Sequence, residues 1–212
     1  MVSYAPRVGF AAPPAGGRAM DWVLMATGFT GALTLVFLAR AVHRRLGWDT
    51  SLATHFSPKG GCTEAIVEEL KRARREILVQ AYSFTSDPLT YGLIEAKKRG
   101  VDVEILLDKS NEVERYSDLH ILLENGLAPL IDGHHAIAHN KIMIIDRRTV
   151  ITGSFNFTNQ AEHENAENLL IIKGHPELIK AYCQNFAAHK EHSQAAQVKT
   201  PAHTGATRNK AA

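Results

Sequence analysis

Apolar and polar positions alternate along the middle of the chain with two periods, one typical of strands and one of helices. Short apolar runs rich in β-branched residues predict strands at 51–56, 76–84, 101–108, 128–132, 139–146, 149–155 and 168–173. Between them, apolar residues three and four apart predict helices at 57–75, 87–100, about 115–125 and 176–190. The run VDVEILLD is nearly continuous in apolar residues, which indicates a strand buried on both faces. Strands alternating with helices predict an α/β sandwich.

An apolar segment precedes this region. Residues 22–39, WVLMATGFTGALTLVFLA, carry no charged side chain. A helix of this length rises roughly 27 Å, at about 1.5 Å per residue, which approaches the thickness of a bilayer core. We therefore expect a transmembrane anchor or the apolar part of a signal peptide.

The sequence leaves both alternatives open. ARA at 39–41 has the small-x-small form of a signal-peptidase site, and cleavage there would release the domain beyond the membrane. Asp21 abuts the apolar run and argues against cleavage, and an anchor followed by Arg40, Arg44 and Arg45 would keep the domain cytoplasmic. We expect a protein that is either membrane-anchored or exported to the periplasm.

These features divide the chain into five segments. They are an N-terminal extension at 1–21, the apolar segment at 22–39, a linker at 40–50, a folded domain at 51–191 and a tail at 192–212. The tail has almost no large apolar residue, so we expect it to be disordered.

The charge of the predicted folded domain differs in sign from that of the whole chain. The 212 residues are 45% hydrophobic, enough for one sizeable core, and the formal net charge is +2. Residues 46–191 nevertheless contain 16 Lys and Arg against 21 Asp and Glu. Nonspecific nucleic-acid binding depends on basic side chains that neutralise phosphates, so any such site must be a local patch. Cys62 and Cys183 predict two ordinary thiols, or a disulfide if the domain is exported.

The stretch HNK places a histidine and a lysine two residues apart in a predicted strand. Side chains alternate across a strand, so His139 and Lys141 point to the same face. GSFN repeats this spacing with Ser154 and Asn156, and a hairpin through DRRT would bring all four side chains to one patch. A nucleophile, a cation and two neutral hydrogen-bonding groups suit attack on a phosphodiester, whose oxygens gain negative charge.

Two further residues of this pattern are expected to be structural. Asp146 has the parity of Ile142 and Ile144, so it faces away from His139. Gly153 allows close approach of the backbone.

The order HxK, four residues, Asp, six residues and GSxN resembles the signature of the phospholipase D superfamily. FSPKGG, AYSFT, AKKRGVDVEILLD, HNKIMIID and TGSFNFT, in this order over roughly 52–190, resemble the small single-motif bacterial endonucleases of the Nuc type. The resemblance implies a bacterial protein with the phospholipase D/nuclease fold. That fold has a mixed central sheet with helices on both faces, and here one motif per chain.

The resemblance also implies a double displacement, in which His139 attacks phosphorus and water then hydrolyses the phosphohistidine. Lys141 and Asn156 would hold the non-bridging oxygens, and Ser154 would assist by hydrogen bonding. Glu167, in NAENLL, matches the family acid that hydrogen-bonds the nucleophilic imidazole. The family needs no metal or other cofactor.

Three histidines close to the motif invite a metal-binding interpretation. His134, His135 and His163 do not form a closed ligand set in the sequence. We therefore expect solvated loop residues and no metal site.

The sequence contains no second His-x-Lys, whereas larger superfamily members carry two such motifs about a pseudo-twofold axis. A homodimer would supply the missing acid. His139 of one chain would attack while the same histidine of its partner protonates the departing oxygen.

Three functions remain open for the chain. Resemblance to the Nuc type favours a sequence-nonspecific nucleic-acid endonuclease, with Arg147, Arg148 and the segment 96–100 contacting flanking phosphates. A phospholipase D acting on phosphatidylcholine or cardiolipin is the second, with residues 22–39 holding it beside lipid headgroups. The third is a dimer that binds nucleic acid without cutting it.

Overall fold

The computed structural model describes residues 30–42, 50–113 and 118–196, and it divides the chain into two units, 1–46 and 47–212. In the first unit, residues 30–42 form a helix. Within the described part of the chain, no helix has the length and apolar character needed to cross a membrane. Much of the predicted apolar segment lies outside the described residues, so its role stays a prediction.

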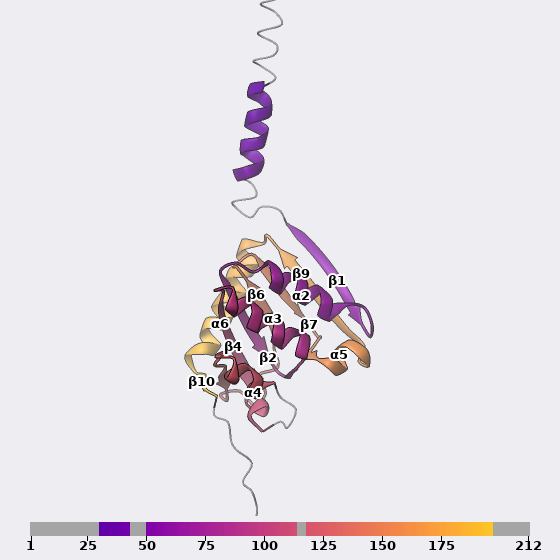
Figure 1. Cartoon of the computed structure of the whole chain (residues 1–212), viewed down its shortest axis with the longest axis vertical. Helices are drawn as coiled ribbons and strands as arrows, with labels where there is room; N and C mark the ends of the chain where they lie inside the picture. Colours follow the sequence, from indigo (N-terminus) through magenta and orange to yellow (C-terminus); the bar gives the residue numbers. More distant parts are fainter. Residues whose placement is uncertain (1–29, 43–49, 114–117, 197–212) are drawn as a thin grey trace, which may run out of the picture. The chain divides into compact units, whose positions relative to one another are not determined.

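The second unit is built on a mixed sheet (Figure 1). Its order within the described residues is β1-β9-β7-β6-β2-β4-β5-β10. The pairs β2–β4 and β4–β5 are parallel and the other neighbours are antiparallel. The strands are β1 Ser51–Ser57, β2 Glu76–Ala81, β4 Asp102–Asp108, β5 Leu130–Asp132, β6 Lys141–Ile145, β7 Thr149–Gly153, β9 Glu167–Lys173 and β10 Gln194–Ala195. Two short strands, β3 Phe84–Thr85 and β8 Phe157–Thr158, pair separately.

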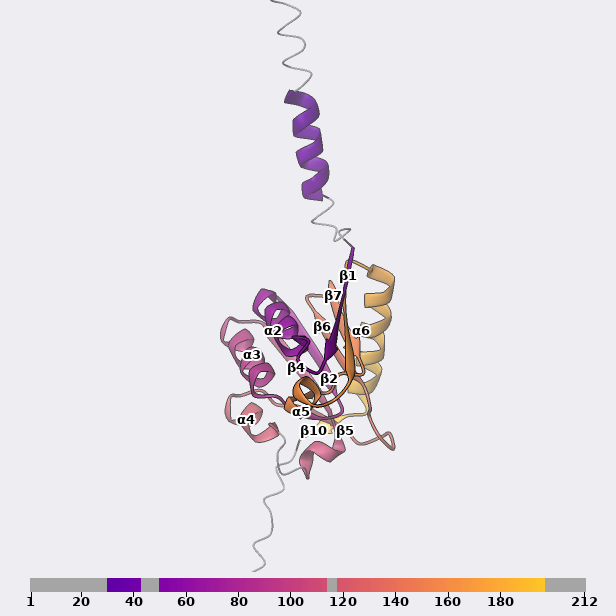
Figure 2. The same cartoon turned by 90° about the vertical axis from the view of Figure 1, so that its right-hand side faces the viewer.

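Helices cover both faces of the sheet, as Figure 2 shows with α2 and α3 on one side and α6 on the other. The α-helices of this unit are α2 Cys62–Arg72, α3 Asp87–Lys98, α4 Leu119–Glu124, α5 Asn159–His163 and α6 Pro176–Glu191, and a short 3₁₀ helix covers Lys109–Glu112. These layers confirm the predicted α/β class with a mixed central sheet.

Alternation along β2 explains the two layers. Ile77 and Val79 belong to the larger core with α2 and α3, whereas Leu78 belongs to the smaller core with Ile179 and Phe186 of α6. Successive side chains of a strand point to opposite faces, so a continuous apolar run fills two cores at once.

The structure differs from several of the predicted boundaries. The strand expected at 76–84 ends at Ala81, and the strand expected at 139–146 begins only at Lys141. The tail expected from residue 192 contributes β10, which pairs with β5 at the edge of the sheet. Polar residues can form a strand there because an edge offers unpaired backbone groups whatever the side chains.

The two cysteines are free thiols on different layers. Cys62 is fully buried in the larger core, whereas Cys183 on α6 packs against the smaller one. Burial raises the pKa of Cys62 to about 11, with the charge of Glu162 acting in the same direction. A buried thiol of this kind is unreactive at neutral pH.

β6 and β7 form the predicted hairpin through DRRT. Asp146 and Arg147 have φ values of 53° and 50°, and the N–H of Arg148 donates to the carbonyl of Ile145. The Asp146 carboxylate accepts hydrogen bonds from the backbone N–H groups of Arg74, Arg75 and Glu76. Asp146 therefore ties the start of β2 to the hairpin.

We predict that Asp146→Ala lowers the free energy of unfolding by about 1–3 kcal/mol, because several backbone donors lose their acceptor. Urea denaturation followed by circular dichroism measures this change. Asp102→Ala is the matched control, because Asp102 is an exposed carboxylate at the start of β4. Equal stabilities of the two variants would contradict the role given to Asp146.

Candidate active site

Five strand ends lie side by side and form one edge of the sheet, the edge that runs across the strands. β6 is antiparallel to β2 and β7, and β9 is antiparallel to β7 and β1. The starts of β6 and β9 therefore lie beside the ends of β2, β7 and β1. The residues at these ends are Ala81, Lys141, Gly153, Glu167 and Ser57. This edge gathers the polar residues that the motif predicts.

His139 lies in the loop that enters β6 and is exposed to solvent. Its ring packs on Tyr82, with 4.6 Å between ring centroids, and the N–H of Tyr82 donates to the carbonyl of Asn140. The N–H of Ala138 donates to the buried carboxylate of Asp108 at 2.7 Å. The imidazole is thus accessible to a substrate while its backbone is fixed on both sides.

Sequence reasoning missed Tyr82 and Asp108. Both follow the apolar run of a strand, Asp108 as the last residue of β4 and Tyr82 directly after β2. Polar and aromatic residues at the carboxyl ends of parallel strands frequently face a site in α/β proteins. That position is the signal that could have found them.

Lys141 is the buried cation of the site, with 6% of its surface exposed. Its Nζ donates to the carbonyl of His139 at 2.7 Å and lies 5.0 Å from the centroid of the Tyr82 ring. Burial lowers the pKa of Lys141, and the negative charge of Glu167 raises it part of the way back. An ammonium group has three donors, so Lys141 keeps protons for a substrate oxygen.

Ser154 and Asn156 are presented by a stretch in which polar and apolar residues alternate. Phe155 and Phe157 are fully buried, which anchors the backbone between them. Ser154 Oγ accepts from the N–H of Asn168 at 3.0 Å. Asn156 Oδ1 is buried and has no hydrogen-bond partner among the described residues. An amide held with unused hydrogen-bonding capacity is typical of a functional site.

Gly153 is required by a close backbone contact. Its φ is +152°, and a Cβ atom there would lie 2.2 Å from the carbonyl oxygen of Asn168. No side chain fits that space, so only glycine allows β7 to meet β9 at the residue before Ser154.

Glu167 is the first residue of β9 and stands opposite Ser57 on β1. Its Oε1 accepts a hydrogen bond from the side chain of Asn165 at 3.1 Å. Its backbone position places it at the same edge as Lys141, and its charge raises the pKa of that lysine. Its contact with the imidazole of His139 stays a prediction.

The structure does not bring the predicted phosphate contacts to this edge. Arg147 and Arg148 lie in the turn after β6, at the opposite end of that strand from Lys141. Arg147 pairs with Glu76 at 2.6 Å. The segment 96–100 ends α3 and leads to the start of β4, which also lies at the opposite edge. There the side chain of Arg99 donates to the carbonyl of Leu70.

The three histidines considered as metal ligands have different surroundings. His134 is exposed in a loop, as expected, whereas His163 is exposed but ends helix α5. His135 is only partly exposed and lies beside the buried carboxylate of Asp132, in a cluster separate from the strand edge. Within the described residues, this cluster is the single group of at least three potential ligands.

The edge combines an accessible imidazole, a buried ammonium group, a hydroxyl and an amide. An imidazole can attack phosphorus, and fixed donors in a poorly solvated place stabilise the charge that develops on the phosphoryl oxygens. The arrangement can therefore perform the first displacement on a phosphodiester.

Comparison with known proteins agrees with this chemistry. A family profile described as "Cardiolipin synthase, PLD-like domain" matches residues 66–190. The chain is 45% identical over 141 residues to a protein of Rickettsia felis named phospholipase D, covering 66% of this chain and 70% of the relative. It is 32% identical over 120 residues to a mitochondrial cardiolipin hydrolase of Chlamydomonas reinhardtii, covering 57% of this chain and 53% of that protein.

The fold has a counterpart among solved structures. Nuc from Salmonella typhimurium, described as a phospholipase D family member, superposes with a TM-score of 0.66 and 32% identity. The match covers 69% of this chain and 98% of Nuc.

The electrostatic coupling of Glu167 and Lys141 predicts a pH effect. Lys141 must be protonated to hold an anionic oxygen, so activity is lost as the pH rises through its pKa. Glu167 raises that pKa, and Glu167→Gln therefore moves the alkaline limb of the pH–rate profile to lower pH. If Glu167 also orients His139, the rate falls on the order of 100-fold.

Hydrolysis of bis(p-nitrophenyl) phosphate between pH 6 and 10 measures both effects. Glu164→Gln, at an exposed carboxylate in the same segment, is the matched control and should leave the profile unchanged. An alkaline limb that does not move in Glu167→Gln would contradict the coupling.

Proposed function

The chain belongs to the phospholipase D superfamily and is a phosphodiesterase of that family, and from this we propose that it hydrolyses the headgroup phosphodiester of a phospholipid. The observation that carries the proposal is the 45% identity to a protein named phospholipase D, over 70% of that relative. The chain retains each polar residue of the motif, from His139 to Glu167.

The surroundings of His139 support a lipid substrate. An open cavity of about 460 Å³ between Tyr82, Asp108 and the loop before His139 includes two exposed apolar side chains. Val113 is 73% exposed and Ile137 is 57% exposed. Apolar side chains beside a phosphodiester site suit contact with acyl chains or with a second protein surface.

The charge distribution also favours this substrate over nucleic acid. Arg147 and Arg99 are engaged at the opposite edge of the sheet, as described above. A nucleic acid would need basic side chains along its phosphates on both sides of the scissile bond. A lipid headgroup places one phosphodiester at the site and needs fewer.

The proposed reaction balances in two steps. An imidazole nitrogen of His139 forms a bond to phosphorus while the bond to the headgroup oxygen breaks, and an acid donates a proton to that oxygen. Water oxygen then forms a bond to phosphorus while the bond to the His139 nitrogen breaks. The water transfers a proton to the same acid–base group, and phosphatidic acid and the free imidazole are released. Lys141 and Asn156 stabilise the non-bridging oxygens in both steps.

The acid is supplied by a second copy of the chain. The motif occurs once in the sequence, and an acid on the far side of phosphorus must come from another molecule. A twofold axis beside the exposed ring of His139 brings the same histidine of the partner subunit to that position.

Nucleic-acid hydrolysis is the second candidate, and the likeness to Nuc over 98% of its length supports it. We predict that the full-length chain in detergent releases headgroup or phosphatidic acid from phosphatidylcholine or cardiolipin vesicles. Plasmid DNA, single-stranded DNA and RNA in parallel assays should stay intact. His139→Ala should reduce lipid hydrolysis by at least about 10³-fold.

Each outcome of these assays identifies one function. Cleaved nucleic acid with intact lipid would replace the proposal by an endonuclease. A gel shift with nucleic acid and no product from any substrate would indicate a binding protein.

The shared site predicts the behaviour of mixed dimers. Wild-type and His139→Ala chains carrying two different peptide tags are coexpressed, and heterodimers are purified through both tags. These heterodimers should lose nearly all activity, because each retains one His139 as nucleophile and lacks the second His139 that would act as the acid. Heterodimers with His163→Ala, at an exposed histidine after β8, should stay fully active. Half of the wild-type rate in the His139 heterodimer would contradict the shared site.

A further inference from the structure

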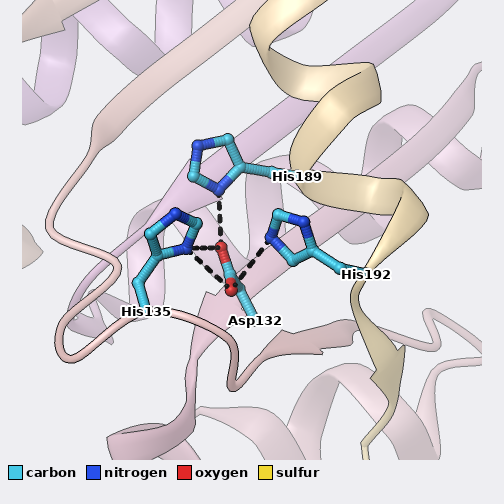
Figure 3. A group of neighbouring side chains, drawn as sticks. All are labelled: Asp132, His135, His189 and His192. Atoms are coloured by element: carbon cyan, nitrogen blue, oxygen red, sulfur yellow. Dashed lines mark hydrogen bonds and ion pairs between the residues drawn. The ribbon is translucent and has the colours of Figure 1, made fainter.

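Four side chains from distant parts of the sequence converge beyond the active-site loop, as Figure 3 shows. Asp132 ends β5, His135 follows in the loop that leads to His139, His189 lies in the last turn of α6 and His192 follows that helix. Their potential ligand atoms all lie within 4.8 Å of one another. The pairing of β10 with β5 returns the chain after α6 to this place.

Two of the three distances to Asp132 match those around a tetrahedral ion. His135 Nδ1 and His192 Nε2 each lie 3.3 Å from Asp132 Oδ1, and His189 Nδ1 lies 2.6 Å from Asp132 Oδ2. Ligand atoms bound at about 2.1 Å in a tetrahedron are about 3.4 Å apart. Small rotations of the side chains therefore suffice to surround an ion.

Hydrogen bonds account for two of the three imidazoles, because His135 and His189 both bond to Asp132. The contact between His189 and Asp132 is short, but His192 Nε2 is buried and its 3.3 Å approach to the carboxylate lacks hydrogen-bond geometry. The ring of His135 stacks on that of His189, with centroids 4.8 Å apart. A buried ring nitrogen directed at a carboxylate without a hydrogen bond leaves both groups available to bind an ion.

The carboxylate of the cluster is buried. Asp132 is 1% exposed, whereas the three histidines around it are partly exposed. One carboxylate oxygen and three imidazole nitrogens are donor atoms that suit a zinc ligand set.

We propose that Asp132, His135, His189 and His192 bind a divalent transition-metal ion, with zinc the best match to their donor atoms. Three imidazole nitrogens and one carboxylate oxygen favour zinc over magnesium or calcium, which prefer sets of oxygen ligands. Four protein ligands close the coordination shell, which is typical of a structural site and not of a catalytic one.

The ion would join the end of α6 and the β5 edge to the loop before the nucleophile. That loop is also held by Lys109, whose Nζ donates to the carbonyl of His135, and by Asp108, which accepts from the N–H of Ala138. The site thus helps to fix the backbone four residues before His139 without touching the substrate. The four ligands are positioning residues.

The test uses the full-length chain purified in detergent without a histidine tag. The protein is treated with a chelator, dialysed and supplied with zinc, and bound metal is measured by mass spectrometry. We expect about one zinc ion per chain and a rise in melting temperature of about 5 °C or more. Cobalt should replace zinc and give the intense visible absorption of a tetrahedral complex.

Variants assign the binding to these residues. His189→Ala combined with His192→Ala should lose both the bound zinc and the zinc-dependent rise in melting temperature. His134→Ala is the matched control, because His134 is exposed and its ring lies 4.7 Å from that of His192, yet it is outside the ligand set. This control should still bind about one ion.

Two results would overturn the proposal. The first is a wild-type chain that binds no zinc, with the faint octahedral spectrum of free cobalt and no change in melting temperature. This measurement needs no variant, so misfolding of the double variant cannot obscure it. The second is a folded double variant that binds zinc as well as the wild type.

Discussion

The antiparallel pairing of β6 with both β2 and β7 is the constraint on which the candidate active site depends. It sets Ala81 opposite Lys141 and Ile142 opposite Thr152, so the loop entering β6 and the loop leaving β7 meet at one edge. A slip of one residue would turn Lys141 to the other face of the sheet. The register is specified by the two apolar cores on either face, and the position of the candidate catalytic groups follows from it.

The buried polar groups at that edge lower the stability of the fold but strengthen the binding of a phosphoryl oxygen. Lys141 is buried and the amide oxygen of Asn156 has no partner among the described residues, and each arrangement costs free energy in the folded chain. The same poorly solvated positions strengthen the attraction of an ammonium group or an amide for an anionic phosphoryl oxygen. The fully buried Phe155 and Phe157 and the two apolar cores supply the compensating stability.

The loop before His139 shows how the ends of parallel strands position the proposed nucleophile. Asp108 and Asp132 end the neighbouring strands β4 and β5, and both carboxylates are buried. Asp108 accepts a hydrogen bond from the backbone N–H of Ala138, and Asp132 pairs with the side chain of His135. The imidazole of His139 can therefore be exposed for attack while the backbone that carries it is fixed.

The sequence by itself determined the α/β class, the order of the main strands and helices, the β6–β7 hairpin and the phospholipase D superfamily, because these follow from local periodicity and from the fixed spacing of one motif. Only the tertiary structure decided that Arg147 lies at the edge opposite to the candidate active site. It also decided that residues after 191 add a strand to the sheet. It alone joined Asp132 to His189, across 57 positions of the chain. Strand pairing and helix packing set such distances, and neither leaves a short-range pattern in the sequence.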